Sequence, residues 1–144
     1  YMKENRLTIS EEDYLEMIYR LSIHKDYTRV NELATHLNVK PPSVSVMIKR
    51  LINKNLIDHS EYGIIKLNDE GRKIGQMLLD RHNTIEKFLT LLELNENLLE
   101  ETEKIEHTLN PSTIIKIKHL VTFFYNNADI LESLQMWIKE KNAI

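Results

Sequence analysis

The fold of this chain is decided by residues 31–67, which have the sequence NELATHLNVKPPSVSVMIKRLINKNLIDHSEYGIIKL. A short helical pattern ends near Leu37, and Pro41 opens a second helix that continues to about Asn55. Two short helices joined by a brief turn form a helix-turn-helix. Strand-like segments flank the turn Ser60–Gly63, so a hairpin follows the second helix. We therefore predict a winged helix-turn-helix.

The second of these helices has an apolar face and a polar face. Its predicted buried positions are Val44, Met47, Ile48 and Leu51. Hydroxyls and cations on the opposite face suit phosphates and base edges, and an exposed Val46 suits a thymine methyl group. Three small helices also pack together in unrelated domains, so the pattern alone is only moderately specific. We predict DNA contacts at Lys40, Pro41, Pro42, Ser43, Ser45, Val46, Lys49 and Arg50.

The remainder of the chain is predicted to be helical, because only three glycines and three prolines interrupt its 144 residues. Ser10 and Asp13 have the spacing of a capping box that opens a first helix with Tyr14, Met17, Ile18 and Leu21 buried. Later helices are expected from Asn68–Asp69 to about Leu92, after Asn95, after Asn110–Pro111, and over Ala128–Lys141. The fold class is therefore mostly α.

Charge is distributed unevenly along the chain. Residues 1–75 carry 12 basic and 11 acidic side chains, a net charge of +1, whereas residues 76–144 carry 7 and 11, a net charge of −4. A DNA-binding domain needs only a local basic face, so the overall net charge of −3 does not exclude one. We predict a winged helix-turn-helix DNA-binding domain over residues 1–70 and a helical domain over residues 71–144.

Coordinating side chains are most concentrated at Glu103-Lys104-Ile105-Glu106-His107. On a helix, positions 103, 106 and 107 lie at i, i+3 and i+4, so two carboxylates and an imidazole point the same way. Oxygen and imidazole donors without sulfur suit Mn²⁺, Fe²⁺ or Zn²⁺. A solvated acidic helix face with one histidine fits the same residues equally well, so this segment alone decides nothing.

Three other polar residues allow two interpretations each. Asp13 either closes the capping box or acts as a ligand, and Glu16 either pairs with Arg20 at i, i+4 or acts as a ligand. His82 falls on the apolar stripe of its helix, where a histidine is more often a core residue than a ligand. The ordinary structural role is the more frequent one for all three.

Several classes of function are excluded by missing features. The chain has no cysteine, which rules out disulfides and fits a cytoplasmic location. It also has no apolar run near the length of a membrane helix and no glycine-rich phosphate loop. A zinc peptidase of the His-x-x-Glu-His kind would need histidine at Glu103, and a di-iron bundle would need paired Glu-x-x-His motifs. We therefore predict that this chain is not an enzyme. The alternative is a winged-helix regulator that senses an organic ligand or nothing.

Four segments, taken in order, resemble one known family along nearly the whole chain. They are residues 12–19, the helix 41–51, Arg81-His82, and residues 103–109. The chain is similar to the diphtheria-toxin-repressor family of metal-dependent transcriptional repressors. Asp13 and Glu103 stand where the iron-responsive branch has Met and Cys, which points to the manganese branch. Val46 departs from the polar or basic side chain usual in relatives, which leaves the operator sequence open.

The resemblance implies a DNA-binding domain, a dimerisation domain and a metal site between them. It implies a homodimer that binds operator DNA and represses metal-uptake genes when Mn²⁺ is bound, with two ions per subunit. Fe²⁺, Zn²⁺ and Cd²⁺ are further candidates for the site. The ligands implied for one ion are Asp13, Glu103, Glu106 and His107; those for the second are Glu16 and His82, with Glu103 and Glu106 shared.

Overall fold

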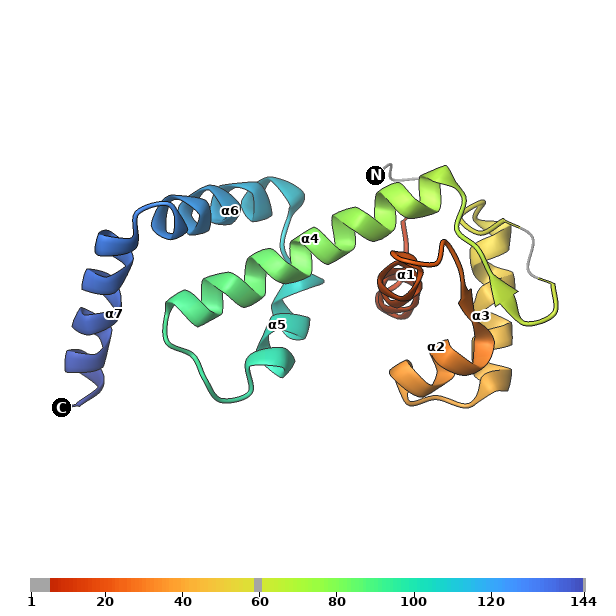
Figure 1. The fold of residues 1–144 in the computed structure, drawn as a ribbon, viewed down its shortest axis with the longest axis horizontal. Coiled ribbons are helices and arrows are strands. Elements are labelled where there is room, and N and C mark those ends of the chain that lie inside the picture. The colour runs from red at the N-terminus through yellow and green to blue at the C-terminus, as the bar shows by residue number, and fades with distance from the viewer. Residues whose placement is uncertain (1–5, 59–60, 144) are drawn as a thin grey trace. The chain divides into compact units, whose positions relative to one another are not determined.

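A computed structural model describes residues 6–58 and 61–143 as two compact units, of which the first ends at Leu79 and the second begins at Asp80. The described residues form seven helices and two short strands, and the predicted mostly α fold class is confirmed (Figure 1). In chain order the elements are α1 (Ile9–Ser22), β1 (Thr28–Arg29), α2 (Val30–Leu37), α3 (Pro41–Asn53), β2 (Ile64–Ile65), α4 (Asp69–Leu91), α5 (Leu98–Glu106), α6 (Pro111–Tyr125) and α7 (Ala128–Asn142).

Helix α1 begins at a capping box different from the predicted one. The Thr8 hydroxyl accepts a hydrogen bond from the Glu11 backbone N–H at 3.2 Å, and the Glu11 carboxylate accepts one from the Thr8 N–H at 3.2 Å. The predicted box at Ser10 and Asp13 is therefore wrong, because Thr8 already has the extended backbone of an N-cap residue. Asp13 is left on the exposed side of the helix.

The core of the first unit lies where α1, α2 and α3 meet. Leu15 and Ile18 are fully buried on α1, and each contributes about 1.5–3 kcal/mol by leaving water. Tyr14, Met17 and Leu21 are only partly buried, so Leu15 takes a core position that the predicted stripe missed. The predicted buried face of α3 is confirmed at all four positions, namely Val44, Met47, Ile48 and Leu51.

The turn of the helix-turn-helix depends on Asn38. This residue has the left-handed backbone angles φ 54° and ψ 48°, which asparagine tolerates better than most residues. Its backbone N–H donates to the carbonyls of Ala34 and Thr35, which ends α2. Pro41 and Pro42 then occupy the first turn of α3, where the missing N–H of proline costs nothing.

The wing differs in part from the predicted hairpin. Strand β2 pairs antiparallel with β1, with Thr28 opposite Ile65 and Arg29 opposite Ile64. The two predicted hairpin arms meet at a single bridge between Ile57 and Leu67. His59, at the end of the first predicted arm, and Ser60, at the start of the predicted turn, lie outside the described residues. The wing is thus a small sheet made with β1, because only a short stretch of each arm pairs.

Helix α4 starts in the first unit and ends in the second. Near its start, a Cβ on Gly71 would collide with the Leu56 carbonyl, so only glycine lets α4 approach the wing this closely. Farther along, Ile85 and Leu89 belong to the core of the second unit. The predicted last core position, Leu92, is 41% exposed, and Leu91 is buried instead because the helix ends there.

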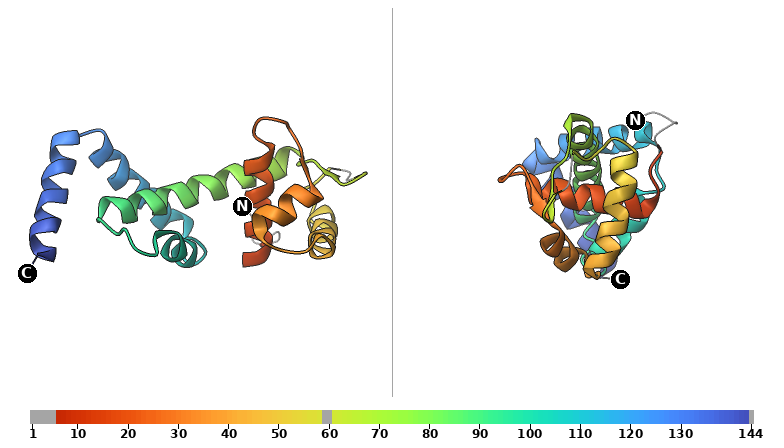
Figure 2. Two further views of the ribbon diagram at one scale, coloured as in Figure 1. Left: turned by 60° about the horizontal axis from the view of Figure 1, so that its bottom comes forward. Right: turned by 90° about the vertical axis from the view of Figure 1, so that its right-hand side faces the viewer.

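Helix α5 lies beside the second half of α4, where Leu98 and Ile105 pack against the Ile85 cluster (Figure 2). Its N-cap residue is Asn97 and not the predicted Asn95. The predicted start of α6 at Asn110 and Pro111 is confirmed.

Helix α7 follows α6 through a short turn and has no buried residue (Figure 1). Large apolar side chains on α6 and α7 are about half exposed, namely Ile115, Leu120, Phe123, Tyr125, Ile130, Met136 and Trp137. None of the described helices is both long and apolar enough to cross a membrane.

Candidate metal centre and nucleic-acid interface

The second unit holds a buried imidazole between two carboxylates. His82 lies in the middle of α4 and is 5% exposed. Its Nδ1 lies 2.7 Å from Glu106 Oε2, and its Nε2 lies 3.1 Å from Glu86 Oε2. Glu106, at the end of α5, is 2% exposed. A buried carboxylate is costly unless a donor or a cation compensates it, so His82 and Glu106 depend on each other.

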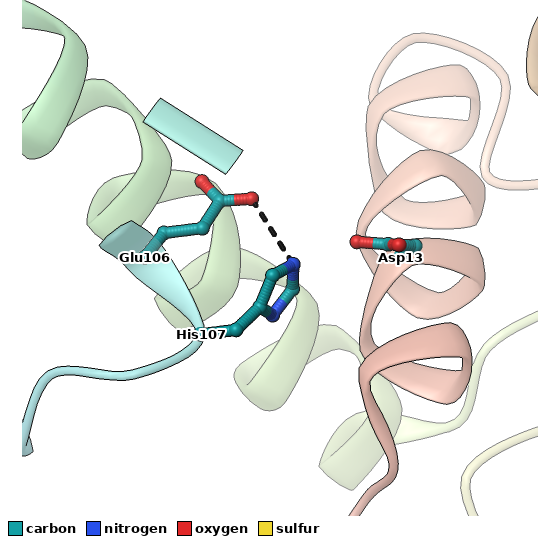
Figure 3. Close-up of side chains that lie close together, drawn as sticks. All are labelled: Asp13, Glu106 and His107. Carbon is teal, nitrogen blue, oxygen red and sulfur yellow. Dashed lines mark ion pairs between the residues drawn. The ribbon is translucent and has the colours of Figure 1, made fainter. Parts of the chain in front are cut away.

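His107 extends this cluster. It follows the last residue of α5, and its Nε2 lies 3.5 Å from Glu106 Oε1 (Figure 3). Arg81 Nη2 lies 3.2 Å from His107 Nδ1. Arginine can only donate hydrogen bonds, so His107 Nδ1 accepts and the ring proton is on Nε2, toward Glu106. Two imidazoles and two carboxylates, of which Glu106 is the buried one, therefore come together from α4 and the end of α5.

Glu103 is not part of this cluster. It is exposed, and no group of three closely spaced donor side chains in residues 6–58 and 61–143 includes it. Positions i and i+3 of a helix differ by about 60° around the axis. Because the Glu106 side of α5 faces α4, that rotation is enough to bring Glu103 to the solvent.

The remaining predicted ligands lie on α1 in the first unit. Asp13 is exposed, and Figure 3 labels it on this helix. The side chain of Glu16 is 14% exposed and lies 2.8 Å from Arg20, which is the i, i+4 pair that its spacing allowed. The structural explanation for Asp13 no longer applies, since Glu11 closes the capping box.

The donors of the second unit suit a divalent metal ion. They are imidazole nitrogens and carboxylate oxygens, largely buried, and the chain has no thiolate to favour a softer ion. A metal-binding histidine typically donates its second ring N–H to an acceptor such as a carboxylate, and Glu86 Oε2, 3.1 Å from His82 Nε2, can accept such a hydrogen bond. The residues present therefore fit a metal such as Mn²⁺.

The exposed face of α3 carries the predicted DNA-contacting residues. All eight are exposed, and Val46 is 62% exposed. The Ser45 hydroxyl donates to the Pro41 carbonyl at 3.3 Å. Arg50, in contrast, is tied to α1, because its Nη2 lies 3.2 Å from Glu11 Oε1.

Three residues with roles in these sites were missed from the sequence. Glu86 lies four residues after His82, a helical spacing that could have revealed it. Arg81 and Glu11 gave no such signal. Their partners, His107 and Arg50, are 26 and 39 residues away in the sequence.

A winged helix-turn-helix followed by a helical unit with clustered metal-binding donors defines a metal-responsive transcription regulator. Two family models match the chain accordingly. "Iron dependent repressor, N-terminal DNA binding domain" matches residues 6–65, and "Iron dependent repressor, metal binding and dimerisation domain" matches residues 68–132. The chain therefore belongs to the family of iron-dependent repressors.

Relatives with similar sequences agree with this assignment. The HTH-type transcriptional regulator MntR of Oceanobacillus iheyensis is 38% identical over 136 residues, which cover 94% of this chain and 92% of the relative. The regulator of the same name from Geobacillus kaustophilus is 40% identical over 129 residues, covering 89% of this chain and 92% of that one.

Solved structures show the same fold. The metal-dependent transcriptional regulator MtsR matches with a TM-score of 0.72 and 29% identity over 81% of this chain and 55% of its own. The manganese regulator SloR matches with a TM-score of 0.69 and 27% identity over 81% of this chain and 55% of its own. The present chain thus spans about half the length of these solved proteins.

Family membership settles the general function. The chain is a DNA-binding transcription regulator whose second domain binds metal and dimerises, and the family consists of repressors and not of enzymes. The match to the metal-binding and dimerisation domain covers α6 and the start of α7, whose large apolar side chains are exposed in a single chain.

Proposed function

We propose that this protein is a cytoplasmic, manganese-responsive repressor of metal-uptake genes. The observation that carries the proposal is the buried pair of His82 and Glu106, 2.7 Å apart, in the domain that matches metal binding and dimerisation. The named manganese regulator SloR among the similar structures supports Mn²⁺ as the ion. Oxygen and imidazole donors support the same choice.

We propose that the ligands come from both domains. Asp13, Glu103, Glu106 and His107 would hold one ion; Glu16 and His82, sharing Glu103 and Glu106, would hold a second. Four carboxylates carry a charge of −4, which two divalent cations balance. Glu103 has to turn from solvent toward Glu106 to take part. Arg81 has to release His107 Nδ1 when Nε2 becomes a ligand, because the ring proton then moves to Nδ1.

The carboxylates of α1 and α5 explain why metal would control DNA binding. Two such groups about 4 Å apart repel by about 4 kcal/mol at an effective dielectric near 20, so without metal they resist sharing one site. A bound cation supplies the positive charge that removes this repulsion. Asp13 and Glu16 belong to the same compact unit as α3, whereas Glu106 and His107 belong to the other unit. Holding them together would fix the spacing of the two α3 helices of the dimer, which are the recognition helices, and this spacing selects the DNA half-sites.

The proposal is tested by DNA binding after complete chelation. Fluorescence anisotropy would follow a duplex that the protein has selected from a random pool in the presence of Mn²⁺. Restoring Mn²⁺ is expected to raise the affinity for this duplex by 1–3 kcal/mol, or about 5- to 150-fold. Equal binding of the chelated and the Mn²⁺-loaded protein would contradict the proposal. Glu70→Gln, an exposed change in the same unit as α1, is the matched control for Glu16→Gln, which is expected to remove the response.

A further inference from the structure

Glu11 is a buried carboxylate outside the metal cluster. It lies in the first turn of α1, and its side chain is 1% exposed. Burying a carboxylate is unfavourable unless hydrogen bonds and cations compensate it. Glu11 needs such partners, and it takes them from the recognition helix.

Two cations about one turn apart converge on Glu11: Arg50 on α3 and Lys54 directly after its last residue. Arg50 Nη2 donates to Glu11 Oε1 at 3.2 Å. Lys54 Nζ donates to the same oxygen at 3.1 Å and lies 2.8 Å from Oε2. The two side chains are 49% and 32% exposed, so each keeps part of its surface toward solvent.

The charge on Glu11 persists at neutral pH. Burial pushes its pKa upward, but the hydrogen bonds from Lys54 and Thr8 outweigh burial and hold the pKa below the ordinary carboxyl value. The contact is therefore an ion pair under physiological conditions.

Lys49 provides the contrast. It is next to Arg50 and exposed, and it forms no ion pair within the part of the chain that the structure describes. A flexible, unpaired lysine can follow phosphates in any register on DNA, whereas a cation held by a buried carboxylate fits them only in a few positions. Non-specific DNA binding comes almost entirely from the electrostatic attraction between such cations and the phosphates.

We propose that Glu11 is a specificity-determining residue of this regulator, which holds Arg50 and Lys54 against α1 and thereby weakens binding to DNA of arbitrary sequence. On its preferred DNA sequence α3 lies in a single register, so Arg50 and Lys54 keep most of their contribution to the binding affinity although Glu11 holds them. On other DNA sequences the two held cations cannot move to reach the phosphates, so they add little to the affinity. Glu11 thus raises the ratio of specific to non-specific affinity. The proposal rests on DNA binding through α3.

Glu11→Gln is the direct test, because glutamine also closes a capping box and so keeps the start of α1. Anisotropy at saturating Mn²⁺ would compare the selected duplex with a shuffled duplex over a range of salt. Each cation that this change frees to contact a phosphate is expected to steepen the salt slope for the shuffled duplex by about 0.9. With one cation freed, the ratio of the affinity at 50 mM salt to the affinity at 200 mM salt rises about threefold to fourfold, and a second freed cation steepens the slope again by a similar amount. Affinity for the selected duplex is expected to change by less than about twofold. Glu32→Gln on α2, which releases Lys25 from the connection between α1 and β1, is the charge-matched control.

A second set of variants tests the idea without relying on Glu11→Gln folding. In the wild type, Arg50→Gln is expected to change the shuffled-duplex slope by much less than Lys49→Gln, which should lower it by about 0.9. In the Glu11→Gln background the two changes should become equal. The proposal would be overturned if Arg50→Gln in the wild type lowered the slope by as much as Lys49→Gln does, about 0.9. It would also be overturned if folded Glu11→Gln had the same ratio of affinities for the selected and the shuffled duplex as the wild type. Absence of binding by the wild type would instead contradict the DNA-binding function itself.

Discussion

A substitution at Asp13 best distinguishes an effect on metal binding from an effect on folding. It is exposed on α1, and the capping role that its position allowed belongs to Glu11. Asp13→Asn keeps the size of the side chain and removes the charge that a metal ligand needs. In chelator, the change is expected to alter the free energy of unfolding by no more than about 0.5 kcal/mol, as is usual for an exposed position.

In Mn²⁺ the same change is expected to lower the free energy of unfolding substantially. At a free Mn²⁺ concentration of about 100 times the dissociation constant, one occupied site stabilises the fold by about 2.7 kcal/mol. If losing the carboxylate weakens the site about 100-fold, only about 0.4 kcal/mol of this gain remains at the same concentration. Asp13→Asn should therefore lose about 2.3 kcal/mol of stability in Mn²⁺ and almost none in chelator.

Urea unfolding followed by circular dichroism, with and without Mn²⁺, measures both quantities. Asp58→Asn, an exposed aspartate in the same unit and outside the proposed ligands, is the matched control and should keep the full metal-linked gain. If Asp13→Asn keeps that gain, Asp13 is not a metal ligand. If it loses the same stability in chelator as in Mn²⁺, Asp13 stabilises the fold and not the metal site.

Three further changes test separate features. Lys49→Ala should lower the salt slope of DNA binding by about one, since this lysine is exposed on α3. A salt titration of the affinity measures this change. A loss of affinity limited to particular base substitutions in the duplex would instead assign Lys49 to base readout. Glu11→Gln should cost about 1–3 kcal/mol of stability in chelator at neutral pH, because hydrogen bonds to a charged group are lost. Burial raises the pKa of Glu11, but the hydrogen bonds from Lys54 and Thr8 lower it by more, so the pKa in the folded protein lies below that in the unfolded chain. The charged Glu11 therefore stabilises the fold fully above the unfolded carboxyl pKa, and this stabilisation disappears as the pH falls through the folded pKa. Urea midpoints of wild type and variant should converge in acid, and a difference independent of pH would count against the ion pair. Asp13→Met should shift the preference of the metal response toward Fe²⁺, because a soft thioether replaces a hard oxygen. Anisotropy with Mn²⁺, Fe²⁺ and Zn²⁺ measures this, and an unchanged ranking would mean that Asp13 is no ligand.

Much of the fold could be predicted because its signals are local. The buried face of α3 follows from helical periodicity, and the start of α6 follows from Asn110 and Pro111. The start of α1 was misplaced because Thr8 to Glu11 and Ser10 to Asp13 both have capping-box spacing. The choice between them depends on tertiary contacts, since Glu11 also reaches α3.

The site was predicted less completely than the fold. Helical spacing placed Glu103 and Glu106 on one side of α5, but it could not say which of them would face α4. The partners that fix the buried side chains are distant in sequence, as with His82 and Glu106, which are 24 residues apart. Periodicity carries no information about such pairs.

The coupling between metal and DNA is the central claim, and linkage provides its most direct test. If Mn²⁺ raises the affinity for DNA by a given factor, then DNA must raise the affinity for Mn²⁺ by the same factor. The measurement is a Mn²⁺ titration of the chelated protein, with and without the selected duplex, read by calorimetry. We expect Mn²⁺ to bind more tightly in the presence of the duplex, by about 5- to 150-fold, and by the same factor that anisotropy gives for the duplex. Equal Mn²⁺ affinity with and without DNA would contradict the account.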